Sequence, residues 1–477
     1  MRSTLIALFV FITTASFAQD GYNIKFKVQG LKDTTVYLAH YYSESTYLKD
    51  TARVNSKGEF TFDGKKALPQ GVYMLVLKNV PLFEFVISQT QRFSFETKTE
   101  DYIKNMKVTG DLDNKLFFED MIFNMDRHLE AEPLMKIIKD STLSDDKKKE
   151  ARESFSKIND KVTAHQKEVI AKHPTTLTAR IFKTSLPVNI PDAPKKADGT
   201  IDSTFQLKWY REHFFDNFDL ADDALIRMRK SIYAEKINEY LDKLYAPQAD
   251  TITKAINKVI ALAKKNQETY KYSVFTIMRK YQEPEIMGLD EVYVNLYDKY
   301  VATGEMDYWM NATYKKNVAE YANRLRKSLV GKTGANLIMQ DLTLKPRSMY
   351  DIKSKYTILF IFDPDCGHCR KETPVLVDFY NKSKTKLDVE VFAVSADTSL
   401  VKMKDFIKEF KMPWITVNGP RTYVGNYQEL YDAVTTPALY ILDRKHKIIG
   451  KKVPVEKLDD FLTQYEKFEK AKSSTKL

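Results

Sequence analysis

Three patterns of hydrophobic and polar positions follow one another along the chain. Between residues 21 and about 110, apolar and polar side chains alternate in short runs that are separated by glycine, proline and aspartate. This alternation is typical of strands with one buried face. We therefore expect a β-rich domain over residues 19–110, a small antiparallel β-sandwich or meander. The expected strands are Ile24–Val28, Glu59–Phe62, Val72–Leu77 and Phe83–Ile87.

Helical spacing replaces the alternation over residues 111–330. Apolar side chains recur three and four positions apart, as at Ile252, Ile256 and Ile260, and glycine nearly vanishes. This period of about 3.6 residues indicates amphipathic helices. We expect an all-α middle domain whose helices are joined by connectors such as Pro187–Pro194 and the stretch around Pro247.

A third pattern begins after Gly331–Gly334, which has the composition of a linker. Tyr356–Phe362 is an almost continuous apolar run, as in a central strand that is covered on both faces. Helical patterning then alternates with further apolar runs at Val389–Ser395 and Ala438–Leu442. Residues 331–477 should form an α/β domain with mixed strand directions, so the chain as a whole is multidomain.

The N-terminus has the features of a secretory signal peptide. Arg2 precedes the apolar run Leu5–Ile12, and small residues end in Ser16-Phe17-Ala18. The apolar run is too short to span a bilayer, and residues 1–18 fit a cleaved signal peptide. We expect a mature protein in the periplasm or cell envelope, soluble after cleavage, with membrane association left open.

Charge excludes one class of partner. The formal net charge is +11, but lysines are interspersed with acidic residues along helices, as in Lys147–Glu150. Such mixed charges are typical of solvated helix faces. With no recognition motif, we do not expect nucleic acid as a partner.

The cysteine count indicates redox chemistry. The chain has two cysteines, Cys366 and Cys369, three positions apart. A disulfide between them closes almost no loop, so it would add little stability. A structural zinc site would need a second pair of ligands, and haem attachment would need a histidine where Arg370 stands. We expect a redox-active Cys366–Cys369 disulfide, with no metal and no other cofactor.

The position of the Cys366-Gly367-His368-Cys369 motif explains its expected reactivity. It falls where a buried strand gives way to a helix, so backbone N–H groups and the helix dipole favour a thiolate at Cys366. His368 can add positive charge beside it. Cys366 should attack a substrate, and Cys369, one turn into the helix, should resolve the mixed disulfide.

Together with Pro374 and with Thr435-Thr436-Pro437 before a strand, this motif resembles the thioredoxin superfamily. Glu372, two residues before Pro374, and the insertion at Ala396–Arg421 resemble its TlpA/ResA-like branch. The resemblance implies that Glu372 accepts a proton during Cys369 chemistry. It also implies that Pro437 is a cis-proline, where the backbone at Thr436 meets a bound substrate chain.

The chain departs from the pattern of this superfamily at two positions. Asp365 stands where many relatives have tryptophan before the first cysteine, and Phe360 replaces the buried aspartate of thioredoxin. The carboxylate of Asp365 should oppose a nearby thiolate, so the pKa of Cys366 should fall less than in relatives.

The resemblance implies an extracytoplasmic thiol-disulfide oxidoreductase, a reductase or isomerase of exported proteins, including those of cytochrome c-type biogenesis. The two preceding domains resemble those of Bacteroidetes-type envelope proteins. The implied partners are exported thiol or disulfide proteins and a membrane electron donor of the DsbD/CcdA kind. One alternative is a redox-switched binding or adaptor protein. A peroxiredoxin-like peroxidase is a weaker one, because Asp363 stands where that chemistry needs threonine or serine.

Overall fold

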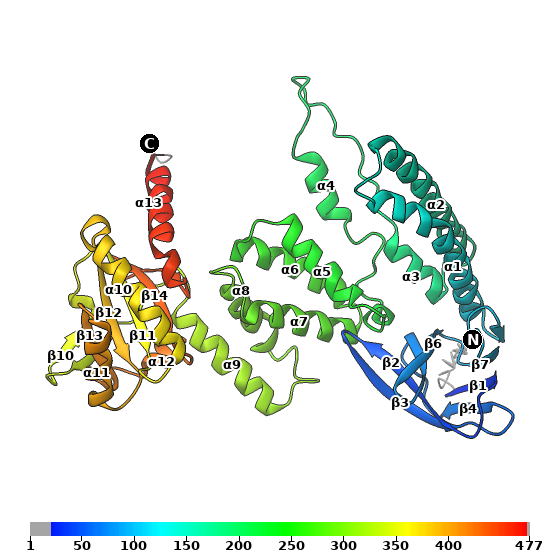
Figure 1. Ribbon diagram of the computed structural model, residues 1–477, viewed down its shortest axis with the longest axis horizontal. Helices are drawn as coiled ribbons and strands as arrows, with labels where there is room; N and C mark the ends of the chain where they lie inside the picture. Colours follow the sequence, from blue (N-terminus) through cyan, green and yellow to red (C-terminus); the bar gives the residue numbers. More distant parts are fainter. Residues whose placement is uncertain (1–20, 475–477) are drawn as a thin grey trace, which may run out of the picture. The chain divides into compact units, whose positions relative to one another are not determined.

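The computed structural model describes residues 21–474 (Figure 1), so the expected signal peptide lies outside the described residues. By its internal contacts the chain divides into two compact units. The first comprises the described residues up to 244 together with 261–270, and the second comprises 245–260 and 271 onward. The boundary expected near residue 330 thus lies inside the second unit.

The first unit begins with a β-sandwich of two four-stranded sheets. Their facing sides share a phenylalanine-rich core, in which the ring of Phe26 lies 4.9 Å from Phe60 and 5.7 Å from Phe85 of the other sheet. One sheet has the order β4 (Glu59–Gly64), β1 (Tyr22–Gln29), β7 (Arg92–Lys98), β8 (Lys107–Thr109). The other has the order β3 (Ser45–Arg53), β2 (Thr35–Tyr42), β5 (Gly71–Leu77), β6 (Val80–Ile87).

The expected sandwich is confirmed, but one detail of its pairing was wrong. We expected antiparallel strands, whereas β1 and β7 pair in parallel, with Phe26 opposite Phe95. Parallel neighbours need a long connection rather than a hairpin, and here the other sheet lies between them in the sequence.

Helices follow the sandwich in the first unit. Asn114 joins the first of them to β6, because its amide donates to the carbonyl of Val86 at 2.7 Å and accepts from the Val86 N–H at 2.8 Å. The helices of this unit are α1 (Leu112–Lys139), α2 (Asp145–Lys172), α3 (Leu177–Ser185), α4 (Phe205–His213), the 3-10 turn Asp223–Ile226 and α5 (Ile232–Leu244).

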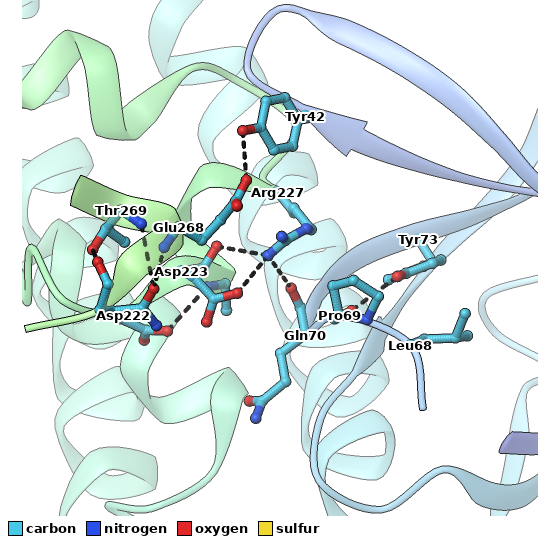
Figure 2. Close-up of polar contacts among 12 residues, drawn as sticks. Tyr42, Leu68, Pro69, Gln70, Tyr73, Asp222, Asp223, Arg227, Glu268 and Thr269 are labelled. Atoms are coloured by element: carbon cyan, nitrogen blue, oxygen red, sulfur yellow. Dashed lines mark hydrogen bonds and ion pairs between the residues drawn. The ribbon is translucent and has the colours of Figure 1, made fainter. Parts of the chain in front are cut away.

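A buried arginine connects these helices to the sandwich (Figure 2). Arg227 donates to the carboxylate of Asp223 at 2.8 Å and to the carbonyl of Gln70 at 3.4 Å. Nearby, the hydroxyl of Tyr42 donates to Glu268 at 2.7 Å. A buried guanidinium is tolerated only with such partners, so these contacts fix the helical segment against the start of β5.

Two helices are shared between the units, and the remaining ones belong to the second. The shared helices are α6 (Ala249–Ala263) and α7 (Gln267–Gln282). The second unit then contains α8 (Asp290–Leu296), a π-helical turn over Tyr297–Val301, and α9 (Ala312–Lys327). Within it, the hydroxyl of Tyr300 donates to Asn257 of α6 at 2.7 Å.

The rest of the second unit is a seven-stranded mixed sheet with helices around it (Figure 1). Every residue of the interior strand Tyr356–Phe362 (β11) is buried, and this strand pairs in parallel with one neighbour and antiparallel with the other. The strand order is β10 (Pro346–Ser348), β9 (Ile338–Asp341), β13 (Ile415–Thr422), β12 (Val389–Ser395), β11 (Tyr356–Phe362), β14 (Ala438–Asp443), β15 (Ile448–Lys451). The helices are α10 (Gly367–Leu387), α11 (Leu400–Phe410), α12 (Tyr427–Leu430) and α13 (Leu458–Ser474), with 3-10 turns at Met349–Asp351 and Val455–Lys457.

This is the expected thioredoxin fold, and β10, β13 and β15 are strands that sequence reasoning did not identify. β13 overlaps the end of the expected insertion 396–421 and pairs in parallel with β12. In the first half of this strand Thr416 and Asn418 are polar but buried. The strand therefore lacks the apolar run of its neighbours.

The outer edge of β15 is occupied by the residues that precede the sheet in the sequence. The N–H of Gly331 donates to the carbonyl of Ile448 at 2.7 Å, and the N–H of Ile448 donates to Lys332 at 2.8 Å. Further along, the N–H of Lys451 donates to the sulfur of Met287 at 3.2 Å. The expected linker and part of the helical segment therefore belong to the same body as the sheet.

No helix within residues 21–474 is both long enough and apolar enough to cross a membrane.

Candidate redox site

The two cysteines lie at the start of α10, shortly after the buried strand β11. A tight turn redirects the chain there, in which the N–H of Cys366 donates to the carbonyl of Asp363 at 3.1 Å. Cys366 is the N-cap residue of α10 and is partly exposed, whereas Cys369 is buried. Both are free thiols. The unpaired N–H groups at this helix start are thus beside the first sulfur.

The surroundings of Cys366 favour its thiolate. The pKa of Cys366 is lowered chiefly by the backbone N–H of Cys369, with a smaller contribution from the N–H of His368. The thiol lies 3.4 Å from the carbonyl oxygen of Thr436, to which it donates. The thiolate is the reactive form of cysteine, and a solvent-accessible thiol with a lowered pKa forms it more readily.

Cys369 is held in the opposite state. Burial raises the pKa of Cys369 to about 12, although the N–H of Asp363 donates to its sulfur at 3.4 Å. The two thiols, one helical turn apart, therefore differ in acidity, and Cys366 ionises more readily than Cys369. Such an asymmetric pair can attack with one sulfur and hold the other in reserve.

The side chains of His368 and Asp365 contribute less than the sequence suggests. His368 is exposed, and it acts on the pKa of Cys366 through its backbone N–H. Asp365 is paired with Lys402 at 2.6 Å, and the same lysine lies 3.1 Å from Asp397. The opposition expected from Asp365 is therefore offset by a lysine from α11.

Phe360, which replaces the buried aspartate of thioredoxin, is fully buried on β11. Its ring stacks on Phe362 at 5.8 Å, and Phe362 stacks on Phe406 of α11 at 4.7 Å. An apolar stack thus stands where thioredoxin has an ionisable group, which leaves Glu372 as a carboxyl within one turn of Cys369.

Glu372 follows Cys369 by one turn of α10 and is half-buried. Burial raises the pKa of Glu372, Glu456 raises it further, and His368 lowers it. Its side chain lines a groove of about 650 Å³ together with Thr435 and Pro437. The Thr436–Pro437 peptide bond is cis, as expected from the resemblance. Glu372 and the cis-proline loop are thus brought together at one groove.

The opposite wall of this groove was not identified from the sequence. It is formed by the segment 282–288 between α7 and α8, which includes Glu283, Glu285, Ile286 and Met287. The available signal was weak: a Pro284 to Gly288 turn in which large apolar side chains interrupt polar ones.

Comparison with known proteins is consistent with this geometry. A family model described as thioredoxin-like matches residues 354–448, and two families described as domains of unknown function match 144–323 and 22–117. The thiol-disulfide oxidoreductase ResA of Bacillus cereus is 28% identical over 147 residues, which cover 30% of this chain and 81% of the relative. ResA of Bacillus subtilis is 26% identical over 121 residues, covering 25% of this chain and 64% of the relative.

Among solved structures, a domain of a possible thiol-disulfide isomerase from Cytophaga hutchinsonii is 40% identical. The match covers 30% of this chain and 97% of that domain, with a TM-score of 0.29. A thioredoxin-like protein from Bacteroides caccae is 18% identical, covers 58% of this chain and 99% of its own, and has a TM-score of 0.47.

The fold and the cysteine pair define a thiol-disulfide oxidoreductase with a thioredoxin-like domain. Within that class, the chain is a TlpA/ResA-like protein, similar to ResA over its thioredoxin-like domain.

Proposed function

We propose that this protein reduces or isomerises disulfides of exported proteins outside the cytoplasm, with Cys366 and Cys369 as its redox centre. The observation that carries the proposal is the contrast between the two thiols. Cys366 is partly exposed and its pKa is lowered, whereas Cys369 is buried and its pKa is raised to about 12.

In the reductive direction the electrons come from the two thiols. The Cys366 thiolate attacks one sulfur of a substrate disulfide, so a mixed disulfide forms and the other substrate sulfur leaves as a thiolate. Cys369 then loses its proton and attacks the sulfur of Cys366. The substrate leaves with both sulfurs reduced. The two electrons come from Cys366 and Cys369, which are now joined in a disulfide. No bound metal or organic cofactor is needed for this exchange.

Glu372 is the proposed acceptor of the Cys369 proton. A thiol with a pKa of about 12 needs a base to attack at neutral pH. Glu372 lies one turn further along the same helix, and its raised pKa brings it closer to the pH at which a base transfers protons effectively.

Thr436 and Pro437 are the proposed contact for the substrate backbone. The carbonyl of Thr436 is already 3.4 Å from the sulfur of Cys366, so a chain that is disulfide-linked to that sulfur must pass beside this loop. The groove lined by Thr435 and Pro437 provides the space.

The proposed location is the periplasm or cell envelope, supported by the signal-peptide pattern of residues 1–18. The proposed partners are exported proteins with cysteines and a membrane electron donor of the DsbD/CcdA kind, which would return the centre to the dithiol form.

Serine substitutions of the two cysteines test the proposal. We expect Cys366→Ser to abolish disulfide exchange, and Cys369→Ser to accumulate a mixed disulfide with substrate, because the release step is lost. Non-reducing gels of the purified variants with a disulfide-bonded substrate would show the trapped species, and reductant should remove it. Equal trapping by both variants would refute the assigned roles.

A further inference from the structure

The groove beside the redox centre has walls from two distant parts of the chain. Thr435, Pro437 and Glu372 belong to the thioredoxin fold, whereas the segment 282–288, which also lines the groove, joins α7 to α8. All these residues lie in the second compact unit. The thioredoxin fold alone would leave this side of its cis-proline loop open.

The added wall is anchored at both ends. The hydroxyl of Tyr321 donates to the carbonyl of Gln282 at 2.6 Å. At the other end, Lys451 donates its backbone N–H to Met287 and pairs its ammonium with Asp290 at 2.5 Å. The side chains of Lys451 and Asp290 are only 5% and 7% exposed. The wall is therefore a fixed part of the groove.

Apolar side chains form part of the lining of the groove. Ile286 and Met287 of the added wall are 48% and 39% exposed, and Leu439 and Val453 lie among the lining residues of the sheet side. Large exposed apolar side chains beside a reactive centre are suited to contact a ligand.

Two of the acidic residues of the groove are already neutralised. Asp290 is paired with Lys451, and Asp432 is paired with Arg324 at 2.7 Å. These two ion-paired carboxylates stabilise the structure around the groove and add little to its negative electrostatic potential.

Three other carboxylates of the lining have no such partner. Within residues 21–474, no cation forms an ion pair with Glu283, Glu285 or Glu372, and Lys452 is the remaining positive charge on the lining. The groove is thus acidic, on a chain whose formal net charge is +11. A cleft lined by one sign of charge concentrates ligands of the opposite sign.

We propose that this groove selects substrates: it favours polypeptides in which apolar and positively charged side chains lie within a few residues of the disulfide-bonded cysteine. The inference rests on the proposed function. The carbonyl next to Cys366 belongs to Thr436, and Thr435 and Pro437 on either side of it line the groove. The neighbours of a cysteine joined to Cys366 therefore enter the groove, where Glu283 and Glu285 meet basic side chains.

Matched peptides test the proposal. Three synthetic peptides with one internal disulfide would differ only in whether lysine, glutamine or glutamate flanks the cysteines. The prereduced mature chain supplies the electrons, and the second-order rate constant of peptide reduction is measured in a single turnover. We expect the lysine peptide to react about tenfold faster than the glutamate peptide at low salt, and the ratio to shrink at high salt.

Charge reversal on the added wall should invert this preference. We expect the double variant Glu283→Lys, Glu285→Lys to reduce the glutamate peptide faster than the lysine peptide. The matched control Glu150→Lys, Glu153→Lys changes the net charge equally at exposed positions of α2, and it should keep the wild-type ratio.

The two proposals fail in different ways. If the wild type reduces the small neutral substrate hydroxyethyl disulfide but shows no preference among the peptides, the groove proposal alone is overturned. It is also overturned if the wall variant keeps the wild-type ratio. If the wild type reduces neither the peptides nor hydroxyethyl disulfide, the oxidoreductase proposal itself falls.

Discussion

Glu372 offers a test of proton transfer at the scale of single residues. Its carboxylate is the form that can accept the Cys369 proton, so resolution of the mixed disulfide should slow as the pH falls through the raised pKa of Glu372. We expect Glu372→Gln to slow this step by about 100-fold and to remove that acidic limb, in line with general base catalysis. Stopped-flow measurement of substrate release across the pH range would show both effects.

Glu456 provides the control for this prediction. Its charge is one cause of the raised pKa of Glu372, so Glu456→Gln should move the acidic limb to lower pH without removing it. An identical pH profile in the wild type and Glu372→Gln would show that the carboxyl takes no part in proton transfer.

His368 lowers the pKa of Cys366 through its backbone N–H, and proline has none. Replacing His368 by proline should therefore destabilise the thiolate, raise the pKa of Cys366 and lower the reduction potential. A pKa change of one unit is about 1.4 kcal/mol, which equals about 30 mV for a two-electron couple, and we expect a shift of that order. Redox titration against glutathione measures it.

His368→Ala separates the two contributions of this residue, because it removes the imidazole and keeps the N–H. A small shift of the reduction potential in His368→Ala and a large one in His368→Pro would assign the effect to the backbone N–H. If alanine shifts the potential as far as proline does, the imidazole is the tuning group after all.

The elements that could be predicted best from the sequence are those whose signals lie in neighbouring residues. The apolar run of β11 and the cysteines at the start of α10 combine strand, turn and helix signals within about 30 residues. β13 was missed because its buried Thr416 and Asn418 lack an apolar pattern. The groove wall at 282–288 could not be predicted, because only tertiary contacts such as that between Lys451 and Met287 place it beside the cis-proline.

One buried ion pair joins the start of α8 to strand β15. Asp290→Ala would leave the ammonium of Lys451 buried without a partner, and breaking such a pair typically costs about 3–5 kcal/mol. We expect a loss of this size in the free energy of unfolding, measured by denaturant titration.

The apolar double variant Asp290→Leu, Lys451→Met is the matched control, because it removes both charges at once. It should recover most of the stability, since replacing a buried pair by apolar residues is often nearly neutral. If the double variant is as unstable as the sum of its single substitutions, the two side chains do not stabilise each other.

At the scale of the whole molecule, the helical region is not one body. The family match over 144–323 crosses from the first compact unit into the second, and α6 and α7 each contribute to both. Residues 271–327 lie in the same unit as the thioredoxin fold. The C-terminal part of the middle domain that we expected from the sequence thus lies in the same compact unit as the thioredoxin fold.

The occupied edge of β15 determines how another chain can bind. A free sheet edge accepts almost any extended strand, because backbone N–H and carbonyl groups are the same in every sequence. Here Gly331 and Lys332 bind the carbonyl and the N–H of Ile448, and the sulfur of Met287 accepts from the N–H of Lys451. An incoming strand cannot pair with Ile448 at this edge, so binding on this side of the sheet must depend more on side chains. Because this edge is occupied, the protein can distinguish between bound chains there by their side chains rather than accept any extended strand.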